Sequence, residues 1–442
     1  MKKYAGALII LCLALVLCCS GCTADADSSP KEANAQDFEY KVLSDGTAEI
    51  TGYNGKDAVL RIPSKLDGHK VISIGDEAFY SPSYNGKEDY LISVIIPDGV
   101  TSIGNQAFFE RTKLISVSIP DSVTSIGTGA FQRCFFLSCV KIPKGVTSIL
   151  KFTFSECSSL KSLVIPDGVT LIGSRAFESC TNLTSLTIPD SVTSFGDYPA
   201  FEACPNLTII TNEGSRAAEQ ARREGISCTN DFSKAEEQGV FYKQGDFAGI
   251  LYSDGTAEIA SYYGREEKVK IPSEIDQHRV VSIGRSAFYP NVYNNSKKIK
   301  SIIIPDGVTY IGGAAFASCR SLTDINIPSS VTFIGNSAFH TCESLTSITI
   351  PDGVTTINDS TFYGCDSLNS VTISKGVTSI GDFAFAACEK LTQVTIPDGV
   401  TSIGEQAFAG CISLTEIILP ESVTSIGENA FYNCQNLTIT RR

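Results

Sequence analysis

Apolar side chains recur along this chain at a fixed interval of 23 residues. Proline marks the interval at positions 97, 120, 143, 166 and 189, and again at 305, 328, 351, 397 and 420. In the repeat at 345–365 the apolar positions are Leu345, Ile348, Ile350, Val354, Ile357, Phe362 and Cys365. Self-similarity at a period of this kind is typical of a solenoid, in which each repeat forms one coil and stacks on its neighbours.

Within one repeat the pattern predicts two short strands and a closing turn. Ser347–Ile350 alternates polar and apolar residues with the period of a strand, and Pro351, which has no N–H to donate, ends it. Val354–Ile357 predicts a second short strand, and Ser360–Cys365 a helical turn. A lone coil buries too little apolar surface to offset the ordering of its backbone, so the coils must stack.

The position directly after the second strand carries almost only one residue type. It is Asn358 in one coil, Leu150 in another, and otherwise glycine, at 75, 104, 127, 173, 196, 284, 312, 335, 381, 404 and 427. Glycine and asparagine tolerate a left-handed backbone at little cost. We therefore expect a positive φ at this position in every coil, with Leu150 as the exception.

The repeats form two arrays, because a longer segment of the chain is duplicated. Ser44–Ile50 recurs 209 residues later as Ser253–Ile259, and the Asp-Gly pair inside each copy predicts a β-hairpin that caps the first coil. The predicted fold is a β-rich repeat solenoid of two tandem arrays of 23-residue coils, each with an N-terminal hairpin cap. The arrays are expected at 38–228 and 241–442, joined by a linker at 229–240.

The two arrays are expected to end differently. Ser215–Glu224 is rich in alanine and charged residues and predicts a helical cap on the first array. The second array carries no such segment before Arg442, which leaves its last edge open to another molecule.

The N-terminus indicates export. Residues 1–21 combine Lys2 and Lys3 with an apolar stretch and small residues before Cys22, which is the pattern of a lipoprotein signal peptide. Cys22 is the expected lipid-attachment site, and 22–37 the flexible tether. Ordinary cleavage with Cys22 incidental is the alternative. The expected location is the bacterial cell surface, with the membrane reached through the lipid anchor only.

The repeat text resembles the BspA-like, Treponema-pallidum-type leucine-rich repeats. Residues 396–411, Ile-Pro-Asp-Gly-Val-Thr-Ser-Ile-Gly-Glu-Gln-Ala-Phe-Ala-Gly-Cys, match the pattern of that family throughout, and the resemblance covers most of the mature chain. It implies a curved solenoid on a bacterial surface, associated with adhesion to host proteins or to other cells. It implies no catalytic residues.

Charge and residue chemistry exclude several functions. The net charge of −13 becomes −15 when the signal peptide and its two lysines are removed, so nucleic acid and other polyanions are not expected partners. None of the three histidines has a recurring nucleophile or carboxylate partner, and we expect no enzyme activity, no cofactor and no metal.

Ten cysteines form one column, three residues after the phenylalanine of each coil, at 134, 157, 180, 204, 319, 342, 365, 388, 411 and 434. Buried free thiols are the favoured interpretation, because equivalent side chains on stacked coils point in parallel, away from disulfide geometry. Disulfides or a metal site remain the alternatives.

Binding residues are expected on two surfaces. The first is the outward face of the strands, where Ser347, Thr349, Ser370 and Thr372 present hydroxyl groups. The second comprises two insertions whose tyrosines suit an interface: Tyr80, Tyr84, Tyr90, Tyr289 and Tyr293. The predicted function is a monomeric adhesin or receptor that recognises a protein or other macromolecule. The alternative is a structural spacer that assembles through the open edge of the second array.

Overall fold

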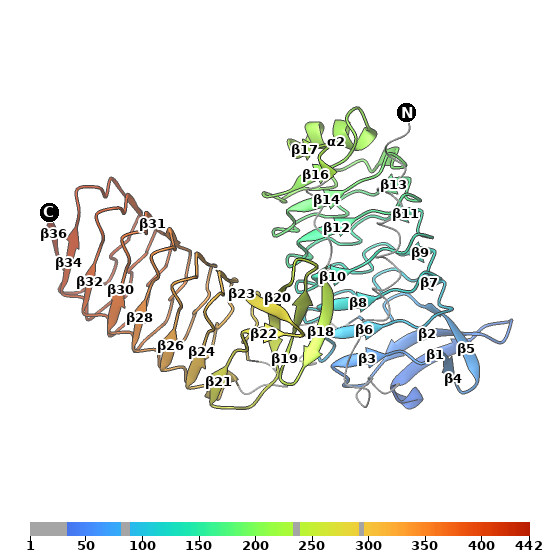
Figure 1. The fold of residues 1–442 in the computed structure, drawn as a ribbon, viewed down its shortest axis with the longest axis horizontal. Helices are drawn as coiled ribbons and strands as arrows, with labels where there is room; N and C mark the ends of the chain where they lie inside the picture. Colours follow the sequence, from blue (N-terminus) through green and yellow to red (C-terminus); the bar gives the residue numbers. More distant parts are fainter. Residues whose placement is uncertain (1–32, 81–88, 233–238, 291–295) are drawn as a thin grey trace. The chain divides into compact units, whose positions relative to one another are not determined.

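The computed structural model describes residues 33–80, 89–232, 239–290 and 296–442, and these residues form a β-solenoid (Figure 1). The solenoid has about 16 coils at intervals of about 23 residues. It divides into two compact units, unit 1 at residues 1–241 and unit 2 at residues 242–442. The predicted fold class is confirmed, whereas the predicted boundaries of arrays and linker stay predictions.

Unit 1 begins with a hairpin and ends with a helix. Its elements are η1 (Ala35–Asp37), β1 (Phe38–Val42), β2 (Ala48–Tyr53), β3 (Val59–Arg61), β4 (Lys65–Leu66), β5 (His69–Ile74), β6 (Ser93–Ile95), β7 (Ser102–Ile103), β8 (Ser116–Ser118), β9 (Ser125–Ile126), β10 (Cys139–Val140), β11 (Ser148–Ile149), β12 (Ser162–Val164), β13 (Leu171–Ile172), β14 (Ser185–Thr187), β15 (Ser194–Phe195), β16 (Thr208–Ile210), α2 (Arg216–Glu224) and β17 (Ser227–Thr229).

Unit 2 also begins with a hairpin followed by coils. An additional strand, β18, precedes its hairpin and starts just before the unit boundary. Its elements are β18 (Val240–Gln244), β19 (Phe247–Leu251), β20 (Thr256–Tyr262), β21 (Lys268–Lys270), β22 (Glu274–Ile275), β23 (His278–Ile283), η4 (Ser296–Lys298), β24 (Ser301–Ile303), β25 (Tyr310–Ile311), β26 (Asp324–Asn326), β27 (Phe333–Ile334), β28 (Ser347–Thr349), β29 (Thr356–Ile357), β30 (Ser370–Thr372), β31 (Ser379–Ile380), β32 (Gln393–Thr395), β33 (Ser402–Ile403), β34 (Glu416–Leu419), β35 (Ser425–Ile426) and β36 (Thr438–Arg441).

Each coil contributes one strand to each of two parallel ladders. In unit 2, β28 pairs with β30 and β29 pairs with β31, with Ile348 opposite Val371 and Ile357 opposite Ile380. The 23-residue step therefore places like residues opposite one another, and the alternation within β28 buries Ile348 while Ser347 and Thr349 stay exposed.

A stack of phenylalanine rings runs through the centre of each unit. In unit 2 the rings from Phe288 to Phe431 lie 5.1 to 5.6 Å apart, centroid to centroid, and nearly parallel. Tyr262 of the hairpin closes one end, 5.1 Å from Phe288, as Tyr53 closes the stack of unit 1 at 5.6 Å from Phe79. The predicted hairpins are present, and they finish the aromatic core as well as the sheet edge.

The expected positive φ after the second strand is wrong. None of those glycines, nor Asn358 or Leu150, has a positive φ. Glycine is favoured there by the close packing of neighbouring backbones, because a Cβ on Gly404 would lie 2.5 Å from the carbonyl carbon of Gly381. The left-handed residues come two positions later, for example Ser360 and Gln406, whose N–H groups donate to the next coil.

The closing segment is a series of turns and not the expected helical turn. Around Phe362, alternate N–H groups bond in different directions. Ser360 and Phe362 donate to carbonyls of the next coil at 2.8 Å, whereas Tyr363 and Cys365 donate within their own coil. The same residues thus close one coil and attach it to its neighbour, so no stretch is left to form a helix.

The helix expected at the end of the first array is present as α2. Its Glu224 carboxylate accepts hydrogen bonds from the N–H groups of Ala200 and Phe201 at 2.9 and 3.0 Å. In other coils the amide at the Phe201 position donates to the following coil, as that of Phe177 does to the carbonyl oxygen of Ala200 at 2.9 Å. Glu224 therefore satisfies a donor that another repeat would otherwise satisfy.

Candidate interaction surfaces

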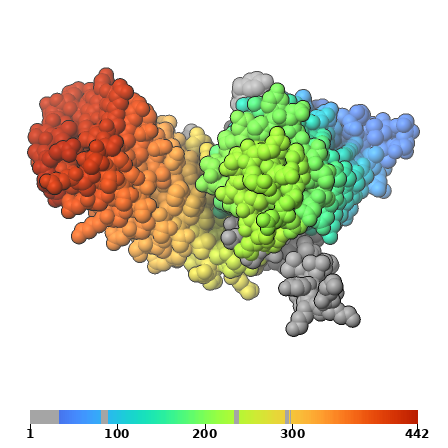
Figure 2. Space-filling view, turned by 90° about the horizontal axis from the view of Figure 1, so that it is seen from above, coloured from blue at the N-terminus to red at the C-terminus, as the bar shows by residue number. Residues whose placement is uncertain are grey.

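The strand face of unit 2 presents the predicted row of hydroxyl groups. Ser347, Thr349, Ser370 and Thr372 are all exposed, and Gln393 and Thr395 on β32 continue the row. Because β28, β30 and β32 pair in register, these side chains form parallel rows. Figure 2 draws the coils of unit 2 in orange to red.

On the same face of unit 1, one of the two outward columns of side chains is buried, whereas the other is exposed at Ser118 and Val164. Ser93, Ser116, Ser162 and Ser185 are between 3% and 7% exposed, although they occupy the positions of Ser347 and Ser370. On the same face, the Cys139 thiol donates to the carbonyl oxygen of Gly239 at 2.9 Å, although the two residues lie far apart in the sequence. Burial raises the pKa of Cys139 to about 11. The equivalence of the two faces in sequence does not extend to their accessibility.

The tyrosine-bearing insertions are only partly described. Tyr84 and Tyr293 lie outside the described residues. Tyr80 is half-buried with its ring 5.3 Å from that of Phe109, and Tyr90 is half-buried beneath the Lys56 amine, 5.6 Å from its ring centroid. Tyr289 is 41% exposed. Of the three tyrosines described, only Tyr289 therefore offers a largely accessible ring.

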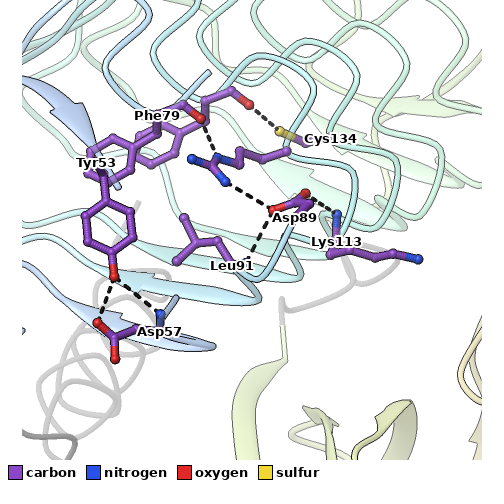
Figure 3. A network of polar contacts seen from close by, with 9 residues as sticks. Tyr53, Asp57, Phe79, Asp89, Leu91, Lys113 and Cys134 are labelled. Carbon is purple, nitrogen blue, oxygen red and sulfur yellow. Dashed lines mark hydrogen bonds and ion pairs between the residues drawn. The ribbon is translucent and has the colours of Figure 1, made fainter. Parts of the chain in front are cut away.

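A buried ion pair holds the end of the unit 1 insertion against the coils. Asp89 accepts from the Arg111 guanidinium at 3.2 Å, and both side chains are about nine-tenths buried. The second Asp89 oxygen accepts from the Lys113 backbone N–H at 3.1 Å, and the first also accepts from that of Leu91 at 3.3 Å (Figure 3). Both carboxylate oxygens of Asp89 thus hold the end of the insertion against the coils.

Arg111 occupies the cysteine position of its coil. Its Nε donates to the carbonyl oxygen of Phe79, the bond that a column cysteine makes in other coils. In unit 2 the equivalent residue is Cys319, whose thiol donates to the carbonyl oxygen of Phe288 at 3.4 Å. The sequence reasoning missed this site. The signal was a charged residue in an otherwise apolar column.

The predicted column of buried thiols is confirmed. All twelve cysteines in the described residues are free, and in the column only Cys434 is more than slightly exposed. Each column thiol donates to the phenylalanine carbonyl of the preceding coil, at 3.0 to 3.4 Å. Burial raises the pKa of Cys365 and of Cys411 to about 12, so these thiols stay protonated at neutral pH.

Two of the three histidines lie in turns, and the third stacks on a neighbouring ring. His69 and His278 use Nδ1 in turns, to the carbonyl oxygens of Gly46 and Asp276, while the His340 ring stacks on Tyr363. Among the described residues no group of three His, Cys, Asp or Glu side chains is placed to hold a metal ion. In the same part of the chain no helix is long and apolar enough to cross a membrane. Cys22 lies outside the described residues.

The repeats match a known family model. The model for the BspA type leucine rich repeat region matches in six copies, over residues 72–208, 281–401 and 378–441. No curated protein matches the chain.

Several solved structures are similar in sequence over much of their length. The leucine-rich-repeat protein of T. pallidum is 34% identical, over 41% of this chain and 83% of its own, with a TM-score of 0.38. A leucine-rich cell surface protein of Faecalibacterium prausnitzii is 28% identical, over 94% of this chain and 96% of its own, with a TM-score of 0.33. A leucine-rich-repeat protein of Bacteroides ovatus is 26% identical, over 90% and 91%, with a TM-score of 0.31.

Proposed function

Because this chain belongs to the BspA-type leucine-rich-repeat family, whose repeats are typical of non-enzymatic binding proteins, we propose that it is a surface protein that binds another macromolecule. The observation that carries the proposal is the open strand face of unit 2. Ser347, Thr349, Ser370 and Thr372 form an exposed, rigid array of hydrogen-bonding groups with no bulky side chain between them. Such a face suits an extended macromolecular partner.

Two further features support this function. Tyr289, at the start of the unit 2 insertion, offers an exposed aromatic ring of the kind that concentrates binding energy at interfaces. In addition, the acidic chain favours a partner that is neutral or basic. Adhesion to a host or neighbouring cell is the role that fits these properties.

The binding test uses the mature protein and a matched pair of variants. We expect saturable binding of labelled protein to cells or matrix, competed by unlabelled protein. Thr349→Lys with Thr372→Lys should weaken this binding at least tenfold, because two long charged side chains would interrupt the hydroxyl row. Ser118→Lys, at the Thr349 position in unit 1, is the control and should change it less than twofold. Binding that ignores the double variant refutes the strand face as the binding surface.

We also propose that Cys22 carries a lipid that anchors the protein to the bacterial membrane, with 22–37 as the tether. This rests on the signal-peptide pattern that precedes Cys22. Cys22→Ala should move the protein from the membrane fraction to the soluble fraction, as measured by immunoblotting of separated fractions. Cys228→Ala, which alters an exposed thiol in unit 1, is the control and should leave the protein in the membrane fraction. Membrane association that survives Cys22→Ala contradicts lipidation.

A further inference from the structure

In unit 2, the residue that follows each phenylalanine of the ring stack is a tyrosine at every third coil. We call this row of positions the turn ridge, and it consists of Tyr289, Ala317, His340, Tyr363, Ala386, Ala409 and Tyr432. Three of these are tyrosines, at 41%, 36% and 66% exposure for Tyr289, Tyr363 and Tyr432. The equivalent positions of unit 1 carry Tyr80 and Phe109 in its first coils, and then Gln132, Ser155, Glu178 and Glu202.

The tyrosines of the turn ridge are evenly spaced. Tyr289, Tyr363 and Tyr432 follow Phe288, Phe362 and Phe431, which are three steps apart along the ring stack. Because neighbouring rings lie 5.1 to 5.6 Å apart, three steps span about 16 Å. Between Tyr363 and Tyr432 the ridge positions carry the small, buried side chains of Ala386 and Ala409, so no large side chain at these positions separates the two exposed rings.

Acidic side chains run along both sides of the turn ridge. Four residues before it stand Asp359, Asp382, Glu405 and Glu428, all exposed, and a shallow groove runs along the last three. Three residues after it stand Glu343, Asp366 and Glu389. Among the described residues only Glu343 of these seven has an ion-pair partner, Arg320 at 2.8 Å.

The charge of the whole coil region agrees with these rows. Residues 301–442 contain 5 basic and 13 acidic residues, a net charge of 5 − 13 = −8. Residues 93–228, the corresponding coils of unit 1, contain 11 basic and 12 acidic residues, a net charge of 11 − 12 = −1. A partner that docks on the turn ridge must therefore be basic, and nucleic acid or an anionic membrane is repelled.

The spacing indicates an extended polypeptide. An extended chain advances about 3.1–3.4 Å per residue, so five residues span about 16 Å. This is the three-coil interval of the tyrosines. An extended segment that runs along the stacking direction can thus reach from one ring to the next, while its lysines or arginines reach the acidic rows and the tyrosine faces.

We propose that the turn ridge of unit 2 docks an extended, basic segment of a partner protein. The proposal rests on the binding function given above and names the class of partner and a second surface for it. Tyr363 and Tyr432 supply aromatic contact, and the carboxylates of Asp359, Asp382 and Glu405 supply the charge that selects a basic sequence.

The test is a fluorescence-anisotropy titration of the full mature chain with two labelled twelve-residue peptides. One alternates lysine and valine, and the other alternates glutamate and valine. We expect saturable binding of the lysine peptide only. Tyr363→Ser with Tyr432→Ser should weaken that binding at least tenfold, and Tyr198→Ser, which removes a 58% exposed tyrosine of unit 1, should change it less than twofold.

A second variant separates charge from packing. Asp359 and Asp382 each accept a backbone hydrogen bond from the next coil, at 2.9 and 2.7 Å. Asp359→Asn, Asp382→Asn and Glu405→Gln together keep an acceptor oxygen at each site but remove three charges, and should weaken binding at least fivefold. Unchanged circular dichroism and thermal unfolding confirm that both multiple variants are folded.

Two results overturn the proposal. The first is binding of the lysine peptide that the tyrosine pair changes less than twofold, even if the charge variant reduces it. The second is equal affinity for the glutamate peptide. Either result can coexist with saturable cell binding that depends on Thr349 and Thr372, so a failure of the turn ridge is distinguishable from a failure of the proposed function.

Discussion

The two units share one core and differ in almost everything that a partner would meet. Both stack phenylalanine rings, both hold cysteine thiols against the phenylalanine carbonyls, and both begin with a tyrosine from a hairpin. On the surface, unit 1 carries a mixed-charge ladder, with Arg133 bonded to Glu110 and Glu156 at 2.8 and 3.1 Å. The same column in unit 2 carries Thr341, Gly364 and Ala387.

This difference separates two kinds of constraint on the sequence. Positions inside the coil are fixed by stacking, since each touches its own copy in the next coil. Positions outside are free to change, so unit 1 carries paired charges whereas the coils of unit 2 carry an excess of carboxylates. The surface on which the two units disagree is therefore the better guide to function than the repeat that they share.

The largest expected effect is a loss of stability in alkali that is greater for unit 2. Burial raises the pKa of five thiols in unit 2, Cys319, Cys342, Cys365, Cys388 and Cys411, and of four in unit 1, Cys134, Cys139, Cys157 and Cys180. The folded chain keeps these protons while the unfolded chain loses them above about pH 8.5. Stability is thus complete below that pH and falls by about 1.4 kcal/mol per pH unit for each thiol as the pH rises towards 12.

Urea unfolding followed by hydrogen exchange between pH 8 and pH 10 resolves the two units. The unfolding midpoint of unit 2 should fall more steeply than that of unit 1, and Cys365→Ala with Cys411→Ala should reduce the slope in unit 2 alone. Equal slopes in both units would remove the thiol column as the cause.

The next largest effect tests the core that the units share. Phe362→Ala and Phe131→Ala each remove a fully buried ring from the middle of a stack. Each should lower the free energy of unfolding by about 3–5 kcal/mol, because the neighbouring rings cannot close the cavity. Chemical denaturation measures both, and Tyr363→Ala is the exposed control. A cost confined to one unit would show that the two cores are not equivalent.

An effect of about 3 kcal/mol is expected from Arg111→Ala, which leaves the buried Asp89 carboxylate without its partner. Arg111→Cys together with Asp89→Asn, which introduces the cysteine chemistry of Cys319, should recover more than half of this loss. Denaturation and hydrogen exchange at Leu91 and Lys113 report the change. If Arg111→Ala is as stable as the parent, the ion pair does not hold the insertion, and the contrast with unit 2 at this position disappears.

The smallest effect concerns the glycine column. Gly404→Ala introduces a Cβ that would lie 2.5 Å from the Gly381 carbonyl carbon, and should cost about 1 kcal/mol. The cost stays small because the column already accommodates Leu150 and Asn358. Gly307→Asn is the control, since its φ of +103° lies in a region that asparagine partly tolerates and nothing lies within 4 Å of its Cβ position. A larger loss for Gly307→Asn would make backbone conformation, and not packing, the stronger constraint.

The repeat period and the apolar pattern were enough to predict the coils, the parallel stacking, the thiol column and the hairpin caps. Each of these depends on residues that recur, such as Ile357, Phe362 and Cys365, so a single misjudged coil does not matter. The left-handed positions escaped prediction because Ser360 and Gln406 are not residue types that favour that conformation. They adopt it because their N–H groups must reach the next coil, which is a property of the stack and not of the local sequence.

The candidate site was less predictable for a related reason. The exposure of Ser347 and Ser370 followed from the alternation of polar and apolar residues. Ser93 and Ser185 occupy the same position in unit 1 but are buried, which alternation alone does not predict. The turn ridge was missed because its tyrosines recur every third coil and so do not appear in a 23-residue pattern. Both features require the comparison of whole units in three dimensions.

The strict spacing of the coils also bears on how such a gene can change. Removing or adding one whole 23-residue segment restores every contact at the new junction, so recombination between repeats yields a folded product of different length. One step in unit 1 is 24 residues long, from Phe177 to Phe201. It comes at the last full coil, before the helix α2 that closes the stack. Whole repeats can thus be added or removed within an array, whereas steps of a different length lie at its ends.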